Sequence, residues 1–236
     1  MSVSRPMSVG RLVLYGTAVA LAVTARTAAG QGAVTGQVTI TERPGETTND
    51  LGNTVVYLDA AAGSAASRVK VPELKEQMAM QSRQFAPRVR VVTVGSKIEF
   101  PNQDPFSHNI FSNAAGASFD LGLYGRGGMK DVEFKKAGAF PIYCNIHSRM
   151  TGYVVVVNTP FRTETGGDGR FSVTGVPAGK YTVHFWHERA PEISRELVVS
   201  AAGVSGVDAK LDASGFKVAA HKNKFGQDYK ASGERY

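Results

Sequence analysis

The stretch that decides the fold is Ala139-Phe-Pro-Ile-Tyr-Cys-Asn-Ile-His-Ser-Arg-Met-Thr-Gly-Tyr-Val-Val-Val-Val157. Its two ends, residues 139–143 and 152–157, are short apolar runs rich in Val, Tyr and Phe, which is a composition typical of β-strands. The residues between them make a tight loop at a strand end that presents Cys144, His147 and Met150 from three directions. The stretch therefore predicts two strands joined by a loop whose side chains carry the chemistry of a site.

The rest of the chain predicts an all-β protein. Among 236 residues, 26 Gly and 10 Pro come too often for long helices. Hydrophobic residues make up 42% and charged residues 20%, so the chain can bury a core and is expected to be soluble. Gly95-Ser96 separates two alternating runs, residues 88–91 and 97–100, which predicts a hairpin. Further strands are expected at residues 33–40, 53–58, 132–134, 171–173 and 181–185, with residues 60–83 forming a loop that carries one helical turn.

The first thirty residues have the layout of an export signal. Arg5 and Arg11 precede a 12-residue apolar run, and small residues follow it as far as Gly30. The run is shorter than the roughly 20 residues that cross a bilayer as a helix. We therefore expect residues 1–30 to be a signal peptide, the remaining chain to have no transmembrane segment, and the protein to be periplasmic or secreted.

The net charge of +7 does not indicate a nucleic-acid partner. Residues 1–30 contribute three of these charges, and the basic tail that we delimit at residues 215–236 contributes three more. The body of the protein is therefore close to neutral. The sequence assigns no role to the basic tail. A solvated tail without a partner is the commoner explanation of such a segment, and an acidic partner or an anionic membrane is the alternative.

The single cysteine of the chain excludes an internal disulfide, a multi-cysteine zinc site and an iron–sulfur cluster. Cys144 begins the pattern C-x-x-H-x-x-M, and His108-Asn109 lies upstream. A thiolate, two imidazoles and a thioether form the ligand set of an electron-transfer copper site, and zinc does not favour methionine. The alternative is that Cys144 is a small buried hydrophobe and that Met150 fills the edge of a core.

The segment from Phe85 to Val157 resembles the cupredoxins, the blue copper proteins that include plastocyanin and amicyanin. The matching residues are Val92-Thr-Val-Gly95 to Phe100, then Asn102, His108-Asn109, and the loop with Cys144, His147 and Met150. The spacing of that loop is most similar to the amicyanin type. The resemblance implies a Greek-key β-sandwich over residues 79–158 with one mononuclear type 1 copper at its end.

The resemblance also implies a role for each site residue. Copper would be bound by the imidazoles of His108 and His147, the thiolate of Cys144 and, as a long axial ligand, Met150. The backbone N–H of Asn109 would point at the cysteine sulfur. Ile146 stands where the amicyanin type has proline, so its N–H could make a second bond to the thiolate and favour the reduced site. His147 would be the electron port, surrounded by Pro105, Phe106 and Ile146.

A second resemblance covers the C-terminal part of the chain. Residues 168–183, with the pattern D-G-x-F followed by G-x-P-x-G-x-Y, are similar to the carboxypeptidase regulatory-like β-sandwich, which is not itself catalytic. We place this unit at residues 160–214. The N-terminal β segment, residues 31–78, fits two topologies: it pairs with residues 160–214 in one discontinuous sandwich, or it supplies the first strands of the copper unit.

These patterns support an exported blue-copper protein that carries single electrons between protein partners. One rival is a copper-handling protein without electron transfer, and another is a β-sandwich interaction module without redox activity. We expect no enzymatic activity, because four protein ligands leave a single copper no open position for a substrate.

Overall fold

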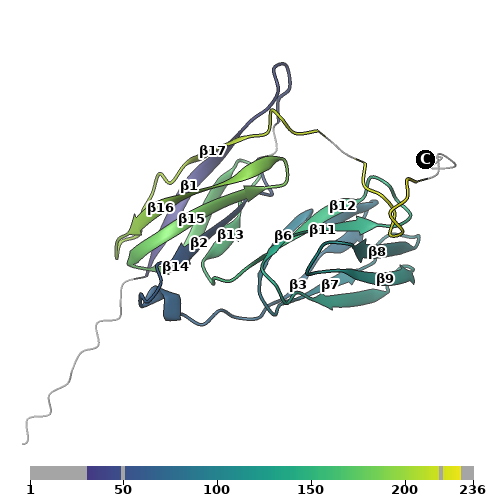
Figure 1. Ribbon diagram of the computed structural model, residues 1–236, viewed down its shortest axis with the longest axis horizontal. Coiled ribbons are helices and arrows are strands. Elements are labelled where there is room, and N and C mark those ends of the chain that lie inside the picture. The colour runs from purple at the N-terminus through teal and green to yellow at the C-terminus, as the bar shows by residue number, and fades with distance from the viewer. Residues whose placement is uncertain (1–30, 49–50, 218–219, 230–236) are drawn as a thin grey trace, which may run out of the picture.

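A computed structural model describes residues 31–48, 51–217 and 220–229, and the expected signal peptide lies outside these ranges. The described chain is all-β, as predicted, and forms two β-sandwiches (Figure 1). The expected helical turn is the short 3-10 helix η1 (Ala66–Arg68). Over the described residues, no helix is both long and apolar enough to span a bilayer.

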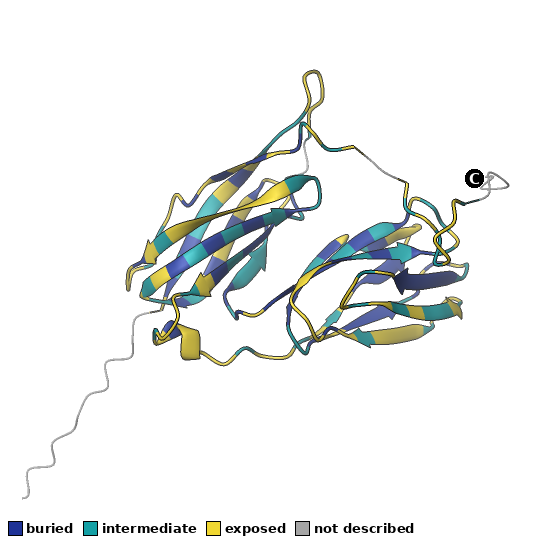
Figure 2. Cartoon of the chain, viewed as in Figure 1, coloured by how far each residue is buried: buried dark blue, intermediate teal, exposed yellow. Residues whose placement is uncertain are grey.

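One sandwich, here called the terminal sandwich, is built from the first two and the last five strands of the described chain. A three-stranded sheet packs against a four-stranded sheet, and the apolar cluster between them includes Val38, Leu58, Phe185 and Leu211. Burial alternates along β15 (Gly179–His187), because successive side chains point to opposite faces (Figure 2). The first sheet has the order β14 (Arg170–Pro177), β1 (Gln31–Thr41), β17 (Ala209–Asp212), and the second the order β13 (Arg162–Glu164), β2 (Val55–Ala60), β15 (Gly179–His187), β16 (Ala190–Val199).

The other sandwich, the central sandwich, is formed by the residues between β2 and β13. Its core includes Phe100, Ile110, Ile142 and Val154 and lies between a five-stranded and a three-stranded sheet. The five-stranded sheet has the order β6 (Val89–Thr93), β12 (Thr151–Val157), β11 (Gly138–Cys144), β8 (His108–Ser112), β9 (Phe119–Tyr124). The three-stranded sheet has the order β10 (Met129–Glu133), β7 (Lys97–Pro101), β3 (Lys75–Gln77), and β4 (Ala79–Gln81) pairs with β5 (Gln84–Ala86).

The predicted hairpin around Gly95-Ser96 is wrong. Strand β6 pairs in parallel with β12, whereas β7 pairs with β10 and β3, so the two strands lie in opposite sheets. The Gly95 turn instead carries the chain across the core, and the N–H of Gly95 donates to the carbonyl of Phe134 at 2.8 Å. The alternation of apolar and polar residues located each strand correctly. It did not specify the sheet to which each strand belongs, because both strands bury apolar side chains in the same core.

The strands of the N-terminal segment pair within the terminal sandwich. Strand β1 is antiparallel to β14 and parallel to β17, and β2 is antiparallel to β13 and β15. Of the two topologies that the sequence allows, these pairings correspond to the discontinuous one. The strands of the central sandwich therefore interrupt a fold whose first and last strands are neighbours in space.

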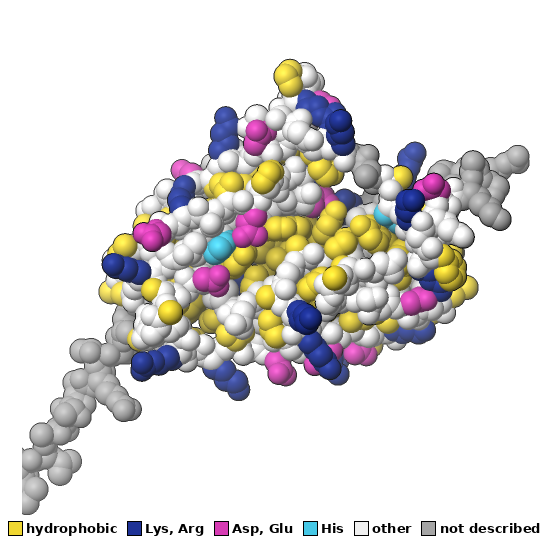
Figure 3. Space-filling model, viewed as in Figure 1, with side chains coloured by type: hydrophobic (Ala, Val, Ile, Leu, Met, Phe, Trp, Pro, Cys, Tyr) yellow, Lys and Arg dark blue, Asp and Glu magenta, His cyan; other side chains and the backbone are white. Residues whose placement is uncertain are grey.

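The two sandwiches touch through a small apolar cluster that includes Val89, Val155 and the partly buried ring of Trp186. Arg88 adds a bidentate ion pair with Glu188, with both N···O distances at 2.8 Å. Beside this contact lies a pocket of about 190 Å³. Figure 3 shows hydrophobic side chains gathered in the hollow between the two sandwiches.

Candidate metal centre

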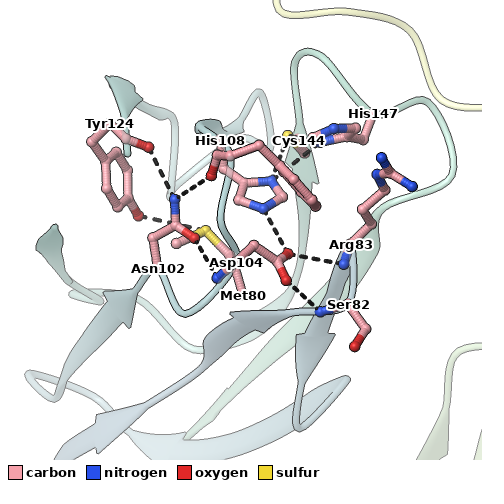
Figure 4. A network of polar contacts seen from close by, with 10 residues as sticks. Met80, Ser82, Arg83, Asn102, Asp104, His108, Tyr124, Cys144 and His147 are labelled. Atoms are coloured by element: carbon pink, nitrogen blue, oxygen red, sulfur yellow. Dashed lines mark hydrogen bonds and ion pairs between the residues drawn. The ribbon is translucent and has the colours of Figure 1, made fainter. Parts of the chain in front are cut away.

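Three of the predicted ligands come together because β8 and β11 are neighbours. His108 is the first residue of β8 and Cys144 is the last residue of β11, and the antiparallel register pairs Cys144 with Ile110. The loop after β11 turns back over this end of the sheet and brings His147 to the same point. Figure 4 shows the ring of His108 between Asp104 on one side and Cys144 and His147 on the other.

The three candidate donor atoms form a compact triangle. Nδ1 of His108 lies 3.6 Å from Sγ of Cys144, Nδ1 of His147 lies 3.4 Å from the same sulfur, and the two nitrogens are 3.1 Å apart. The point equidistant from these three atoms is about 2 Å from each, which is close to the length of metal–imidazole and metal–thiolate bonds. The residues present therefore fit a metal ion that takes two imidazoles and one thiolate.

The fourth predicted ligand, Met150, closes the loop. Its N–H donates to the carbonyl of His147 at 3.0 Å, and its carbonyl accepts from the N–H of Cys144 at 3.2 Å. The side chain is 1% exposed and packs in the same apolar cluster as Cys144. The role of its sulfur as an axial ligand remains a prediction.

Asp104 orients His108, and no sequence motif pointed to it. Its carboxylate lies 2.9 Å from Nε2 of His108 and also accepts the backbone N–H groups of Ser82 and Arg83 at 2.7 and 2.9 Å. Ser82 and Arg83 form the two-residue turn between β4 and β5, with φ angles of 54° and 57° that are typical of a type I′ turn. Asp104 therefore connects this hairpin to the predicted ligand His108.

The hydrogen bond to Asp104 also fixes which nitrogen of His108 is available. Burial of Asp104 would raise its pKa, but the hydrogen bonds from Arg83, His108 and Ser82 outweigh burial and lower it. Burial lowers the pKa of His108 more than the carboxylate raises it, so the ring is neutral near pH 7. An ionised carboxylate only accepts, so the proton is on Nε2 and the lone pair of Nδ1 faces Cys144 and His147.

The residues expected around His147 differ in what they contact. Phe106 touches both histidines edge-on, with ring centroids 5.4 Å from His108 and 5.6 Å from His147. The guanidinium of Arg83 lies over the ring of Phe106, 4.7 Å from its centre. Pro105 and Ile146 are exposed, and Ile146 keeps 43% of its surface accessible. The surface at His147 is therefore apolar, with a cation beside it.

Asn109 links the two ligand segments. Its carbonyl accepts the N–H of Asn145 at 2.8 Å, and its side-chain amide donates to Asp120 at 2.6 Å. The first bond holds the residue after His108 against the residue after Cys144, and the second connects Asn109 to β9. The predicted contact between the N–H of Asn109 and the cysteine sulfur remains a prediction, as does the corresponding contact of Ile146.

Part of the basic tail lies against the ligand loop. We call residues 220–229 the C-terminal strap; it is the yellow segment beside the ends of β8 and β11 in Figure 1. The hydroxyl of Tyr229 donates to the carbonyl of Cys144 at 2.7 Å, and the N–H of Lys224 donates to the side chain of Asn145 at 3.0 Å. The net charge of the tail gave no indication of these contacts. The composition did offer a signal, because a solvated tail seldom carries rings such as those of His221, Phe225 and Tyr229 among its lysines.

No family model and no curated protein matches the chain. Among solved structures, a purple cupredoxin from Nitrosopumilus maritimus matches 35% of this chain and 99% of its own, with 21% identity and a TM-score of 0.32. An amicyanin variant in its reduced state matches 43% of this chain and 99% of its own, with 21% identity and a TM-score of 0.33. A copper-containing nitrite reductase from Thermus scotoductus SA-01 matches 42% of this chain but only 25% of its own length, with 25% identity and a TM-score of 0.34.

Proposed function

We propose that this protein is an exported cupredoxin-type protein that holds one copper ion and carries single electrons between redox proteins. The observation that carries the proposal is the triangle formed by Nδ1 of His108, Nδ1 of His147 and Sγ of Cys144. Two imidazoles with one thiolate are the donors of an electron-transfer copper site, and Met150 supplies a thioether beside them. When bound, copper would supply a one-electron couple between Cu(I) and Cu(II).

The chain's own part is to keep these donors in place. His108 and Cys144 are fully buried on adjacent strands, and Asp104 fixes the ring of His108 from behind. Ligands that are already in position need little movement when the charge of the site changes, which favours rapid electron transfer. The buried setting also keeps water away from the thiolate and so protects it from oxidation.

His147 is the ligand best placed for exchange of electrons with a partner. It is only partly buried, whereas His108 and Cys144 are 0% exposed. Phe106 packs against its ring, and Ile146 presents an apolar surface next to it. We therefore assign His147 as the electron port and a protein with a matching apolar face as the partner. The terminal sandwich, which we propose to be of the carboxypeptidase regulatory-like type, then serves as a scaffold.

A visible absorption spectrum of the purified protein loaded with Cu(II) tests the proposal. We expect a strong thiolate-to-copper band that a mild reductant bleaches and an oxidant restores, with one copper retained per chain through repeated cycles. The Cys144→Ala variant should lack the band. A colourless protein that binds no copper would overturn the proposal, and loss of the metal at each reduction would favour copper handling instead.

A further inference from the structure

We propose that the C-terminal strap stabilises the metal centre by restraining the backbone at Cys144, and that Tyr229 is the positioning residue for Cys144. This inference rests on the proposed function and assigns to residues 220–229 a role that their composition did not reveal. The hydroxyl of Tyr229 reaches the carbonyl of Cys144 at 2.7 Å across 85 residues of sequence. Cys144 ends β11, so this bond holds the backbone of the thiolate residue where the strand gives way to the loop.

The strap contains a turn that is held by its own hydrogen bonds. The side-chain oxygen of Asn223 accepts the N–H groups of Phe225 and Gln227, both at 3.0 Å, and the N–H of Asn223 donates to the carbonyl of Gln227 at 2.8 Å. Gly226 has a φ of 75°, a conformation that glycine adopts without strain. This turn fixes the spacing between the contacts made by Lys224 and Tyr229.

The strap also reaches the His108 side of the site. The ammonium group of Lys224 lies 2.6 Å from the carboxylate of Asp120, and Asp120 accepts the side-chain amide of Asn109, the residue after His108. The N–H of Lys224 donates to the side chain of Asn145, the residue after Cys144. Lys224 therefore connects the strap to both segments that bear ligands.

His221 fixes the near end of the strap. Its ring stacks on Tyr143, the residue before Cys144, with centroids 4.4 Å apart and planes 20° apart. The ring of Tyr229 meets the same imidazole edge-on at 5.2 Å. The strap thus contacts the residues on both sides of Cys144 as well as its carbonyl, and Cys144 cannot move outward without breaking these contacts.

A strap that restrains Cys144 in this way should change two measurable properties of the site. The metal-free loop should open less often, which protects its amides from exchange with solvent. The copper-bound site should lose its metal more slowly and keep one orientation of the thiolate, which determines the thiolate-to-copper absorption. A tail that merely rests on the surface would change neither property.

The Tyr229→Phe variant tests this role, because it keeps the ring but removes the hydroxyl, and with it the bond to Cys144 and a longer contact of 3.3 Å with Nδ1 of His221. The matched control is Tyr181→Phe in the terminal sandwich, where a tyrosine hydroxyl donates to the carbonyl of Pro177 at the same distance of 2.7 Å. In the metal-free protein, the amides of Cys144 and Asn145 should exchange about two- to tenfold faster in Tyr229→Phe than in wild type or in the control, the range expected for one hydrogen bond. With Cu(II) bound, transfer of copper to excess EDTA should accelerate by a similar factor, and the thiolate band should shift.

A second variant separates the strap from the single hydroxyl. Asn223→Ala removes the acceptor that closes the turn and should reproduce both effects while leaving Tyr229 intact. If Tyr229→Phe matches wild type in amide exchange or in copper transfer, the proposed role is overturned. If wild-type protein shows no thiolate-to-copper band at all, the proposed function fails first, and the wild-type titration alone reveals it.

Discussion

The carboxylate of Asp104 lies 2.9 Å from Nε2 of His108, on the side of the ring that faces away from Cys144. Both residues are buried, with 5% and 0% of their surfaces exposed. The carboxylate thus sets the tautomer, the orientation and the basicity of a ring that cannot be reached from solvent. In protein metal sites, such partners of a ligating histidine contribute strongly to metal affinity.

Replacing Asp104 should therefore weaken copper binding. We expect Asp104→Ala to reduce the affinity for Cu(II) by about 10- to 100-fold, because the imidazole loses the group that fixes its tautomer. A competition titration against a chelator of known affinity measures the change. Asp131→Asn, at an exposed carboxylate on β10, is the control and should bind copper as wild type does. Equal affinities for the two variants would contradict this account of Asp104.

The backbone of Ile146 leads to a second prediction. Proline has no N–H, so Ile146→Pro removes any hydrogen bond from this position to the thiolate of Cys144. Such a bond favours the reduced site, and its loss should lower the reduction potential of the bound copper. Protein-film voltammetry of wild type and variant measures the difference. A potential that stays the same or rises would show that Ile146 makes no such contribution.

His187 leads to a prediction about stability and pH. Burial, followed by the positive charge of Arg189, lowers its pKa to about 4. In the unfolded chain the histidine has a pKa near 6.5 and binds the proton more tightly than in the folded protein. The free energy of unfolding therefore falls as the pH drops from about 6.5 to about 4. The full shift corresponds to at most about 3 kcal/mol of unfolding free energy. Denaturant unfolding at several pH values should show a flatter profile for His187→Gln, and an unchanged slope would argue against this assignment.

Two glycines with the same backbone angle allow a matched test of packing. Gly63 and Gly169 both have φ of 77°, but a Cβ at Gly63 meets nothing within 4 Å, whereas at Gly169 it would lie 2.2 Å from the carbonyl oxygen of Val38. Gly63→Ala should cost about 1–2 kcal/mol of unfolding free energy from the left-handed conformation alone. Gly169→Ala should cost about 1–3 kcal/mol more, because the turn must move away from β1. Thermal unfolding of both variants provides the comparison, and equal losses would rule out the close contact.

The sequence predicted the parts of the site that depend on local order. Strands β11 and β12 and the loop between them follow from two short apolar runs and from the spacing of Cys144, His147 and Met150 within seven residues. The pairing of β8 with β11 then brings His108 to this loop, as the resemblance to cupredoxins implied. These features were accessible because each depends on neighbours along the chain or on a motif that keeps its order.

Contacts between distant residues could not be predicted in the same way. Asp104 is one of several acids in the chain, and only the folded loop shows that it faces His108. Tyr229 is 85 residues from Cys144, and no periodicity connects them. The assignment of β6 and β7 to one hairpin failed for a related reason, since alternation indicates burial but does not specify the partner strand.

The interrupted order of the terminal sandwich has a consequence for biosynthesis. The ribosome makes β1 and β2 first, but β13 to β17, which complete the same sandwich, only after the whole central sandwich has been made. The central sandwich is continuous in sequence and can fold while the early strands wait with unpaired edges, which are prone to aggregation. The strap follows β17 in the chain, so its contacts with Cys144 form only once Tyr229 has been made. A chain truncated before Tyr229 would lack these contacts and would present a less protected ligand loop to any metal or oxidant that it meets.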